Sequence, residues 1–373
     1  MLPVNELVKF AAEQYTKIAS TLPPSGDYPS LGVPTNPTWK TSKKEWTVGF
    51  YPGSLWLIFE HTGDAKWRQL AEASQEGVKA FENNTQTHDV GFVIMSTYGN
   101  GYRLVHNKSY ERVIKNAAKS LATRFKPKVG CFRSWNNRPG DGGTPDEFKV
   151  IVDNMMNLEL MYTASILTGD SKYREMADSH ARRTLKEHFR SDGSSYHVVA
   201  YSQTTGKVLR KYTWQGYADS SCWGRGQAWA LAGYTISYRF TKDPAFLQVA
   251  TKVADYFIDH LPDDGVPYWD FNAPLDAGYV PRDTSAAAVA ASGLLELFNH
   301  TNEKRYFEAG EKMLISLASS KYRADGRPEY RIPAILVNGT IFYKQGIFDT
   351  ATPYGDYYFL HALGLYRRLK GSE

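Results

Sequence analysis

The chain has 373 residues, of which 42% are hydrophobic and 14% aromatic. This composition excludes a disordered chain and provides a core for one large domain or two ordinary ones. The net charge of +5 comes from 44 basic and 39 acidic residues, and no Lys/Arg run exceeds a pair. Nucleic acid is therefore not an expected partner, whereas a small anionic substrate is compatible with the modest net positive charge.

Two cysteines, Cys131 and Cys222, exclude a disulfide framework and a four-cysteine zinc site. The N-terminus enters an amphipathic helix without the basic start and apolar core of a secretion signal, and no stretch approaches the ~18 apolar residues of a membrane span. We expect a cytoplasmic protein with no membrane partner. Four Asn-x-Ser/Thr sequons keep secretion open as an alternative, at Asn83, Asn107, Asn299 and Asn338.

A short turn followed by a helix with a leading aromatic residue recurs along the chain. In each copy apolar or small residues return at helical spacing, which predicts a helix with one buried face. The Asp or Asn ahead of each copy is a candidate N-cap, and Gly63 and Gly169 are candidate ends of the preceding helices. The leading aromatic residues of the five copies are Trp67, Tyr110, Tyr173, Phe246 and Tyr306. An N-terminal helix over Val4–Leu22 is the sixth predicted outer helix.

Between these copies lie helices that are apolar or small around most of their circumference, which predicts burial on all sides. Inner and outer helices alternate, so we expect an all-α single domain over residues 1–373. Its predicted architecture is an (α/α)6 barrel of six helical hairpins, with an open helical solenoid as the rival. The predicted inner helices are Tyr51–His61, Gly91–His106, Asp153–Leu167, Gly226–Phe240, Asp283–His300 and Tyr354–Leu369.

Asp89 and Asp153 each sit where a loop turns into an apolar helix. Each could be a helix N-cap, and Asp283 is better explained as a cap than as a reactant. In a closed ring, however, the loops entering the inner helices gather at one mouth, where aromatic side chains would surround the two carboxylates. Flat aromatic walls with a few polar groups are typical of sugar sites. The other residues expected there are Trp46, Phe50, His88, Asn154, Gln215, Trp223, Arg225, Arg282, Tyr354 and Asp356.

Seven separated motifs follow one another from Trp46 to the C-terminus. They are Trp46-Thr-Val-Gly-Phe-Tyr-Pro-Gly-Ser-Leu-Trp56, His88-Asp-Val-Gly-Phe92, Asp153-Asn-Met-Met-Asn157, Gln215-Gly-Tyr-Ala-Asp-Ser-Ser-Cys-Trp-Gly-Arg-Gly-Gln-Ala-Trp229, Pro267-Tyr-Trp-Asp270, Arg282-Asp-Thr-Ser-Ala286 and Tyr354-Gly-Asp-Tyr357. In this order they closely resemble the motifs of the unsaturated glucuronyl hydrolases. A sister family, the unsaturated rhamnogalacturonyl hydrolases, is less similar around His88 and the Gln215–Trp229 motif.

The resemblance implies an (α/α)6 barrel and a glycosidase that removes a 4,5-unsaturated uronic acid from lyase-generated oligosaccharides by hydrating its vinyl ether. Asp153 would be the single general acid and base, and Asp89 its partner carboxylate. A nearby negative charge would raise the proton affinity of Asp153. The implied substrate-binding residues are His197, Gln215, Arg225, Trp46, Trp223, Trp229, Tyr354 and His88, although Trp229 is equally well explained as core.

Two other classes of function remain open. A sugar epimerase on the same barrel would use a pair of basic groups such as His88 and His197 and would leave the aspartates idle. A binding protein without activity would keep the tryptophans and could lose Asp153. No metal-ligand spacing is present, so we expect no metal and no cofactor. We further expect a monomer or weak homo-oligomer and, for want of a C-terminal Ser/Lys cluster, no preference for sulfated glycosaminoglycans.

Overall fold

The computed structural model describes residues 2–22, 26–136, 143–276 and 278–371, and the chain over these ranges is mostly helical. The chain forms two compact units. Unit 1 comprises Met1–Val78 and Ile258–Glu373, and unit 2 comprises Lys79–Phe257.

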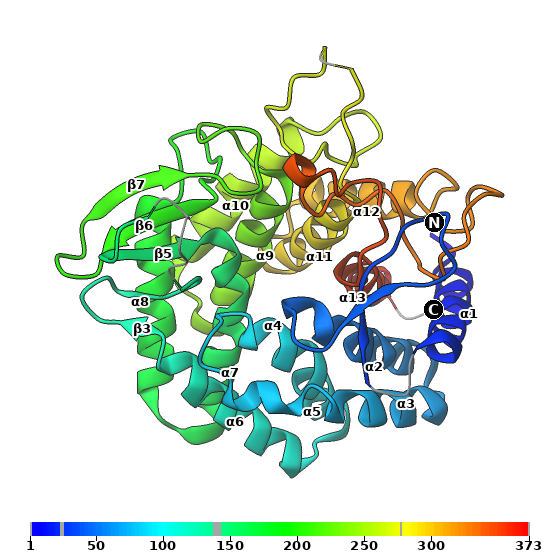
Figure 1. Cartoon of the computed structure of the whole chain (residues 1–373), viewed down its shortest axis with the longest axis horizontal. Helices are drawn as coiled ribbons and strands as arrows, with labels where there is room; N and C mark the ends of the chain where they lie inside the picture. Colours follow the sequence, from blue (N-terminus) through cyan, green and yellow to red (C-terminus); the bar gives the residue numbers. More distant parts are fainter. Residues whose placement is uncertain (1, 23–25, 137–142, 277, 372–373) are drawn as a thin grey trace. The chain divides into compact units, whose positions relative to one another are not determined.

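Unit 1 is built from long helices whose buried faces meet. Helix α11 packs against α12 and α13, and α2 packs against α3 and α13 (Figure 1). Every residue of α11 from Thr284 to Leu297 is buried, as predicted for an inner helix. The elements of unit 1 are α1 (Val4–Thr21), β1 (Tyr28–Leu31), β2 (Lys40–Ser42), η1 (Trp46–Gly49), α2 (Phe50–Thr62), α3 (Ala65–Glu76), α11 (Thr284–Thr301), α12 (Lys304–Leu317), η5 (Tyr343–Gln345) and α13 (Pro353–Lys370).

Unit 2 combines helices with short strands. Its elements are η2 (Lys79–Asn83), α4 (Val90–Ile94), η3 (Met95–Gly99), α5 (Asn100–Val105), α6 (Lys108–Ala122), β3 (Phe125–Lys126), β4 (Cys131–Phe132), β5 (Glu147–Ile151), η4 (Val152–Asn157), α7 (Leu158–Thr168), α8 (Ser171–Glu187), β6 (Val198–Ser202), β7 (Val208–Tyr212), α9 (Gly224–Thr241) and α10 (Pro244–Asp259), whose last two residues belong to unit 1.

The predicted inner and outer segments are all helical, but the all-α prediction missed an antiparallel sheet. Strands β5, β6 and β7 pair in that order, and β5 and β6 are buried along their whole length (Figure 1). Their apolar residues join a cluster of Val129, Cys131, Phe148, Val150, Val199 and Tyr201. Five-residue strands give too short a period-2 signal to stand out among long helical segments.

Two of the predicted inner helices are not regular α-helices throughout. The segment predicted over Gly91–His106 passes through a π-helical stretch, η3, between α4 and α5. The segment predicted from Asp153 starts as the 3₁₀ helix η4 before it continues as α7. Such departures from α geometry are frequent at functional sites, and both segments carry one of the two aspartates at or next to their start.

The capping residues at the outer helices follow the prediction with one exception. The side chains of Asp64, Asn107 and Asp170 accept hydrogen bonds from the first-turn backbone of α3, α6 and α8. Asn302 was wrongly assigned, because it ends α11 in the left-handed conformation (φ 57°) and Glu303 precedes α12. Asn is one of the few non-glycine residues that adopts this conformation readily, which explains why Asn302 ends α11 instead of capping α12.

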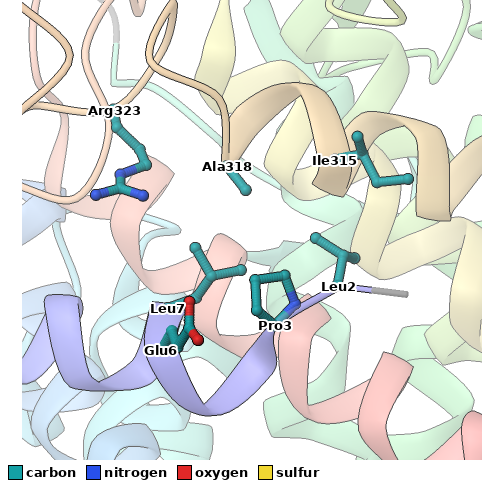
Figure 2. A pocket seen from close by; sticks show the side chains of 7 residues that line it. All are labelled: Leu2, Pro3, Glu6, Leu7, Ile315, Ala318 and Arg323. Carbon is teal, nitrogen blue, oxygen red and sulfur yellow. The ribbon is translucent and has the colours of Figure 1, made fainter.

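A largely apolar groove lies in unit 1, where the N-terminal residues meet α12 and the segment after it. It carries none of the predicted site residues. Figure 2 shows its lining of Leu2, Pro3, Glu6, Leu7, Ile315, Ala318 and Arg323. Within the described ranges, none of the helices combines the length and the hydropathy needed to cross a bilayer.

Candidate active site

Asp153 is placed by the sheet of unit 2. Strand β5 ends at Ile151, which pairs with Val198 at the start of β6. The residue after Ile151, Val152, donates its N–H to the carbonyl of His197 at 3.0 Å, and this brings Asp153, one residue further on, close to His197. The Nε2 atom of His197 lies 3.8 Å from Asp153 Oδ2.

The hydrogen bonds of His197 define which ring nitrogen carries the proton. Its Nδ1 accepts from the backbone N–H groups of Trp214 and Gln215, both at 3.3 Å. A nitrogen that accepts is unprotonated, so the neutral ring carries its hydrogen on Nε2. The N–H of His197 therefore points toward Asp153.

The environment of Asp153 favours its protonated form. Burial raises the pKa of Asp153 to about 7, while Arg225 and the aspartate's own backbone N–H oppose this shift and the charge of Asp89 adds to it. Its Oδ2 is buried and has no hydrogen-bond partner among the described residues. A carboxyl group with a pKa near neutrality is suited to general acid and base catalysis.

The start of α9 supplies an indole and a guanidinium to the same cluster. The ring centroids of Trp223 and His197 are 4.5 Å apart, and the Arg225 guanidinium lies 4.6 Å from the Trp223 ring centroid. A Cβ at Gly226 would come within 2.6 Å of the Trp223 ring, so glycine is needed for the indole to fold over the helix start. Helix α9 also packs along η4.

Asp89 precedes α4, and both of its carboxylate oxygens lie close to its own neighbours. Thr87 Oγ1 donates to Asp89 Oδ2 at 2.7 Å, and His88 Nε2 lies 3.3 Å from Asp89 Oδ1. The side chain of Asp89 does not cap α4, and Asp153 lies inside η4 rather than at its N-cap. Capping therefore does not account for either aspartate.

Comparison with known proteins identifies the family to which the chain belongs. The model of Glycosyl Hydrolase Family 88 matches residues 26–370. The chain belongs to this family. An unsaturated glucuronyl hydrolase of Formosa agariphila is 39% identical, covering 94% of this chain and 89% of the relative. An unsaturated glucuronyl hydrolase of Bacillus sp. GL1 is 32% identical, covering 92% of each chain.

A solved structure shows the same relationship in three dimensions. The crystal structure of an unsaturated glucuronyl hydrolase specific for heparin matches with a TM-score of 0.91 and 38% identity, covering 98% of this chain and 97% of that one. The predicted family and the predicted enzyme class, a glycosidase of the unsaturated glucuronyl hydrolase type, are confirmed.

The remaining predicted site residues of this family member lie in different surroundings. Trp229 is fully buried, and its ring packs edge to face with Phe92 at 5.0 Å. In unit 1, Trp46 is half-buried and its ring centroid lies 4.8 Å from that of the buried Tyr354. Substrate contacts by Trp46, Tyr354 and Trp229 stay predictions.

Three polar residues expected at the mouth have structural partners in unit 1. Asp283 caps α11 by accepting from the backbone of Ser285 and Ala286, as the capping interpretation predicted. Arg282 pairs with Asp264 at 3.2 Å and donates to the carbonyl of Val266. Each oxygen of the fully buried Asp356 accepts one backbone N–H, from Ile335 and Leu336.

Sequence reasoning missed several residues that hold the cluster in unit 2. The ring of Trp135 lies edge to face with His197 at 5.8 Å. Arg124 donates to the carbonyls of Thr85 and Ser134, and so ties the segment before Asp89 to the segment that carries Trp135. Asn157 stands four residues after Asp153 in a recognised motif, but nothing in the sequence told its function.

The described residues contain no group of three or more His, Cys, Asp or Glu side chains arranged to hold a metal ion. The independence of the enzyme from metals and cofactors stays a prediction.

Proposed function

We propose that Asp153 is the single general acid and base with which this enzyme removes a 4,5-unsaturated uronic acid from the non-reducing end of lyase-generated glycosaminoglycan fragments. The observation that supports this most strongly is the burial of the Asp153 carboxyl group, whose Oδ2 lies 3.8 Å from His197 Nε2 and has no hydrogen-bond partner among the described residues; this burial raises its pKa to about 7. A group that titrates near neutral pH gives and takes a proton at little cost.

The reaction is a hydration in which atoms balance. Asp153 gives its proton to carbon 4, and the electron pair of the double bond forms the new C–H bond. Water adds its oxygen to carbon 5 and returns one proton to Asp153. The resulting hemiketal opens, and the hemiacetal left at carbon 1 releases the aglycone. One carboxyl group thus suffices, whereas ordinary glycosidases require two.

The neighbouring groups divide the remaining tasks. Arg225 is suited to the uronate carboxylate, because a guanidinium fork binds both oxygens of such a group. Trp223 is buried beneath Arg225 and against His197 and so holds both groups in place, and its own contact with the sugar ring stays a prediction. The Nε2–H of His197 points toward Asp153 Oδ2 and orients the acid and the reacting water. Asp89 contributes negative charge that raises the pKa of Asp153.

The relatives suggest the class of aglycone. Their names include an unsaturated chondroitin disaccharide hydrolase of Streptococcus pyogenes, 32% identical over 90% of this chain, in addition to the enzyme specific for heparin. We infer a glycosaminoglycan disaccharide as the substrate. The expected lack of preference for sulfated forms stays a prediction, and a panel of sulfated and unsulfated disaccharides compared by kcat/KM tests it.

We further propose that the alternating helices close into one (α/α)6 barrel, a single catalytic domain over residues 1–373. The alternation of buried inner helices with one-faced outer helices supports this, as does a match to solved family members over 98% of the chain.

The assay follows the ultraviolet absorbance of the conjugated double bond. We expect the purified protein to bleach this absorbance for unsaturated uronate disaccharides without added metal. Asp153→Asn should lower kcat by roughly 1,000-fold or more, since general acid–base catalysis alone supplies about 100- to 10,000-fold, and should leave substrate binding measurable. The control is Asp259→Asn, because Asp259 is exposed and paired with Arg305. Near-normal turnover by Asp153→Asn, or a stable signal with every disaccharide, would contradict the proposal.

A further inference from the structure

Asn157 is completely buried and bridges two parts of the site in unit 2. Its Oδ1 accepts from the backbone N–H of Phe92 at 2.8 Å, and its Nδ2 lies 3.2 Å from His88 Nδ1. The Phe92 N–H can only donate, so the oxygen of the amide must face Phe92. The amide nitrogen must then face His88, where it can only donate.

This contact decides the tautomer of His88. Nδ1 accepts from Asn157, so it is unprotonated, and the neutral ring carries its hydrogen on Nε2. Nε2 lies 3.3 Å from Asp89 Oδ1. Burial lowers the pKa of His88, and of the groups that face it Asp89 raises this pKa, Arg124 lowers it and Asn154 raises it. His88 is therefore neutral, and the nitrogen that carries its hydrogen lies 3.3 Å from Asp89 Oδ1.

Gly91 shows that the chain is shaped around this contact. A Cβ at Gly91 would lie 2.5 Å from Asn157 Oδ1 and 2.6 Å from Asn157 Cα, distances that side-chain carbons do not adopt. Only glycine lets the start of α4 come close enough to η4 for Asn157 to reach both Phe92 and His88. The glycine of the His88-Asp-Val-Gly-Phe92 motif thus has a physical explanation.

Each of the two aspartates has the protonated nitrogen of a neutral histidine near it. His197 carries its hydrogen on Nε2, 3.8 Å from Asp153 Oδ2, because two backbone N–H groups occupy its Nδ1. His88 carries its hydrogen on Nε2, 3.3 Å from Asp89 Oδ1, because the Asn157 amide occupies its Nδ1. The first tautomer is set by the backbone and cannot be changed by substitution, whereas the second depends on one side chain.

We propose that Asn157 is a positioning residue that fixes His88 in its Nε2–H tautomer, so that His88 and Thr87 together hold both oxygens of Asp89 in place for catalysis. This rests on the proposed function of the Asp89–Asp153 pair. Because Asn157 acts through His88 and not on the sugar, its loss should affect kcat more than KM.

Asn157→Asp is the most informative change, because it preserves volume and replaces only the donor. One carboxylate oxygen still accepts from Phe92, and the other faces His88 Nδ1, where it can only accept. A proton must then sit on Nδ1. If the ring stays neutral, the hydrogen beside Asp89 is lost; if the ring becomes charged, its positive charge beside Asp89 offsets the negative charge with which Asp89 raises the pKa of Asp153. Both forms reduce turnover at neutral pH.

The tautomer is read directly by nitrogen NMR of protein labelled with ¹⁵N-histidine, and the His88 signals are identified by their disappearance in His88→Gln. We expect the wild-type ring to carry its proton on Nε2 and the Asn157→Asp ring to carry one on Nδ1. The variant should lose roughly 10- to 100-fold in kcat, the usual effect of losing a polar contact to a charged group, while KM changes by less than about threefold.

Asn100→Asp is the matched control, because Asn100 is also buried in unit 2 and its Oδ1 accepts from Arg103 at 3.0 Å. It adds a carboxylate without facing His88 and should retain both tautomer and kcat. A wild-type His88 with its proton on Nδ1, or an Asn157→Asp protein with unchanged tautomer and kcat, would overturn the proposal. The NMR result needs no substrate, so failure of the proposed function would show separately as an inactive wild type.

Discussion

As the proposed general acid, Asp153 must hold a proton at the start of each turnover, although it lies in the first turn of a helix, where backbone N–H groups favour the charged form. The structure shows how this conflict is resolved. Burial is the largest contribution to the raised pKa, and the repulsion from Asp89 that the sequence suggested is a smaller one. Arg225 acts in the opposite direction, so the two charged neighbours partly cancel.

The pH dependence of the reaction follows from this pKa. The acid is active only when protonated, so kcat/KM should fall as the pH rises through about 7. A substrate carboxylate bound to Arg225 would reduce the effect of Arg225 on Asp153, so the corresponding limb of kcat should lie at higher pH than that of kcat/KM. Steady-state rates between pH 5 and 9 measure both, and coincident limbs would contradict the role of Arg225.

Asp153 should also make the free energy of unfolding depend on pH. The folded-state pKa of Asp153 is about 7 and the ordinary value 3.8, so its contribution to the free energy of unfolding is fully present below pH 3.8 and is lost as the pH rises through about 7. The variant Asp153→Asn has no ionisable group at this position and therefore does not lose stability in this way. Its melting temperature relative to wild type should therefore increase between pH 5 and pH 8, by an amount that corresponds to a few kcal/mol at most. A constant difference would show that Asp153 is not protonated in the fold.

At the scale of elements, the close approach of α4 and η4 depends on Gly91. Gly91→Ala should destabilise the protein by about 1–3 kcal/mol, the usual cost of overpacking, and lower kcat as Asn157 is displaced. Gly364→Ala is the control, because a Cβ at that helical position meets nothing nearer than 3.5 Å. Chemical denaturation of both variants measures the difference, and equal stabilities would contradict the packing described.

Much at this scale could be predicted from the sequence. The inner helices are recognisable because they are apolar all round, and the outer ones because a capped turn and an aromatic residue precede one apolar face. The β5–β6–β7 sheet was not predicted because its strands are short. Asn157 was not predicted for a different reason: it lies in the same family motif as Asp153, but its function depends on the approach of α4, which no local pattern encodes.

At the scale of the whole molecule, the proposed barrel makes a prediction about cooperativity. If residues 1–373 form one domain with a common core, the two compact units should unfold together. Calorimetry should then show a single transition in which the calorimetric and van't Hoff enthalpies agree. Two resolved transitions would indicate separate domains and would contradict the single-domain proposal.

The proton on Asp153 is the central claim, and infrared difference spectroscopy of wild type against Asp153→Asn tests it most directly, without substrate. The wild type should show the carbonyl band of a protonated carboxyl group that is absent from the variant and disappears with a midpoint near pH 7. A midpoint near the ordinary aspartate value of about 4 would contradict the account, because Asp153 would then be ionised at neutral pH and unable to act as the acid.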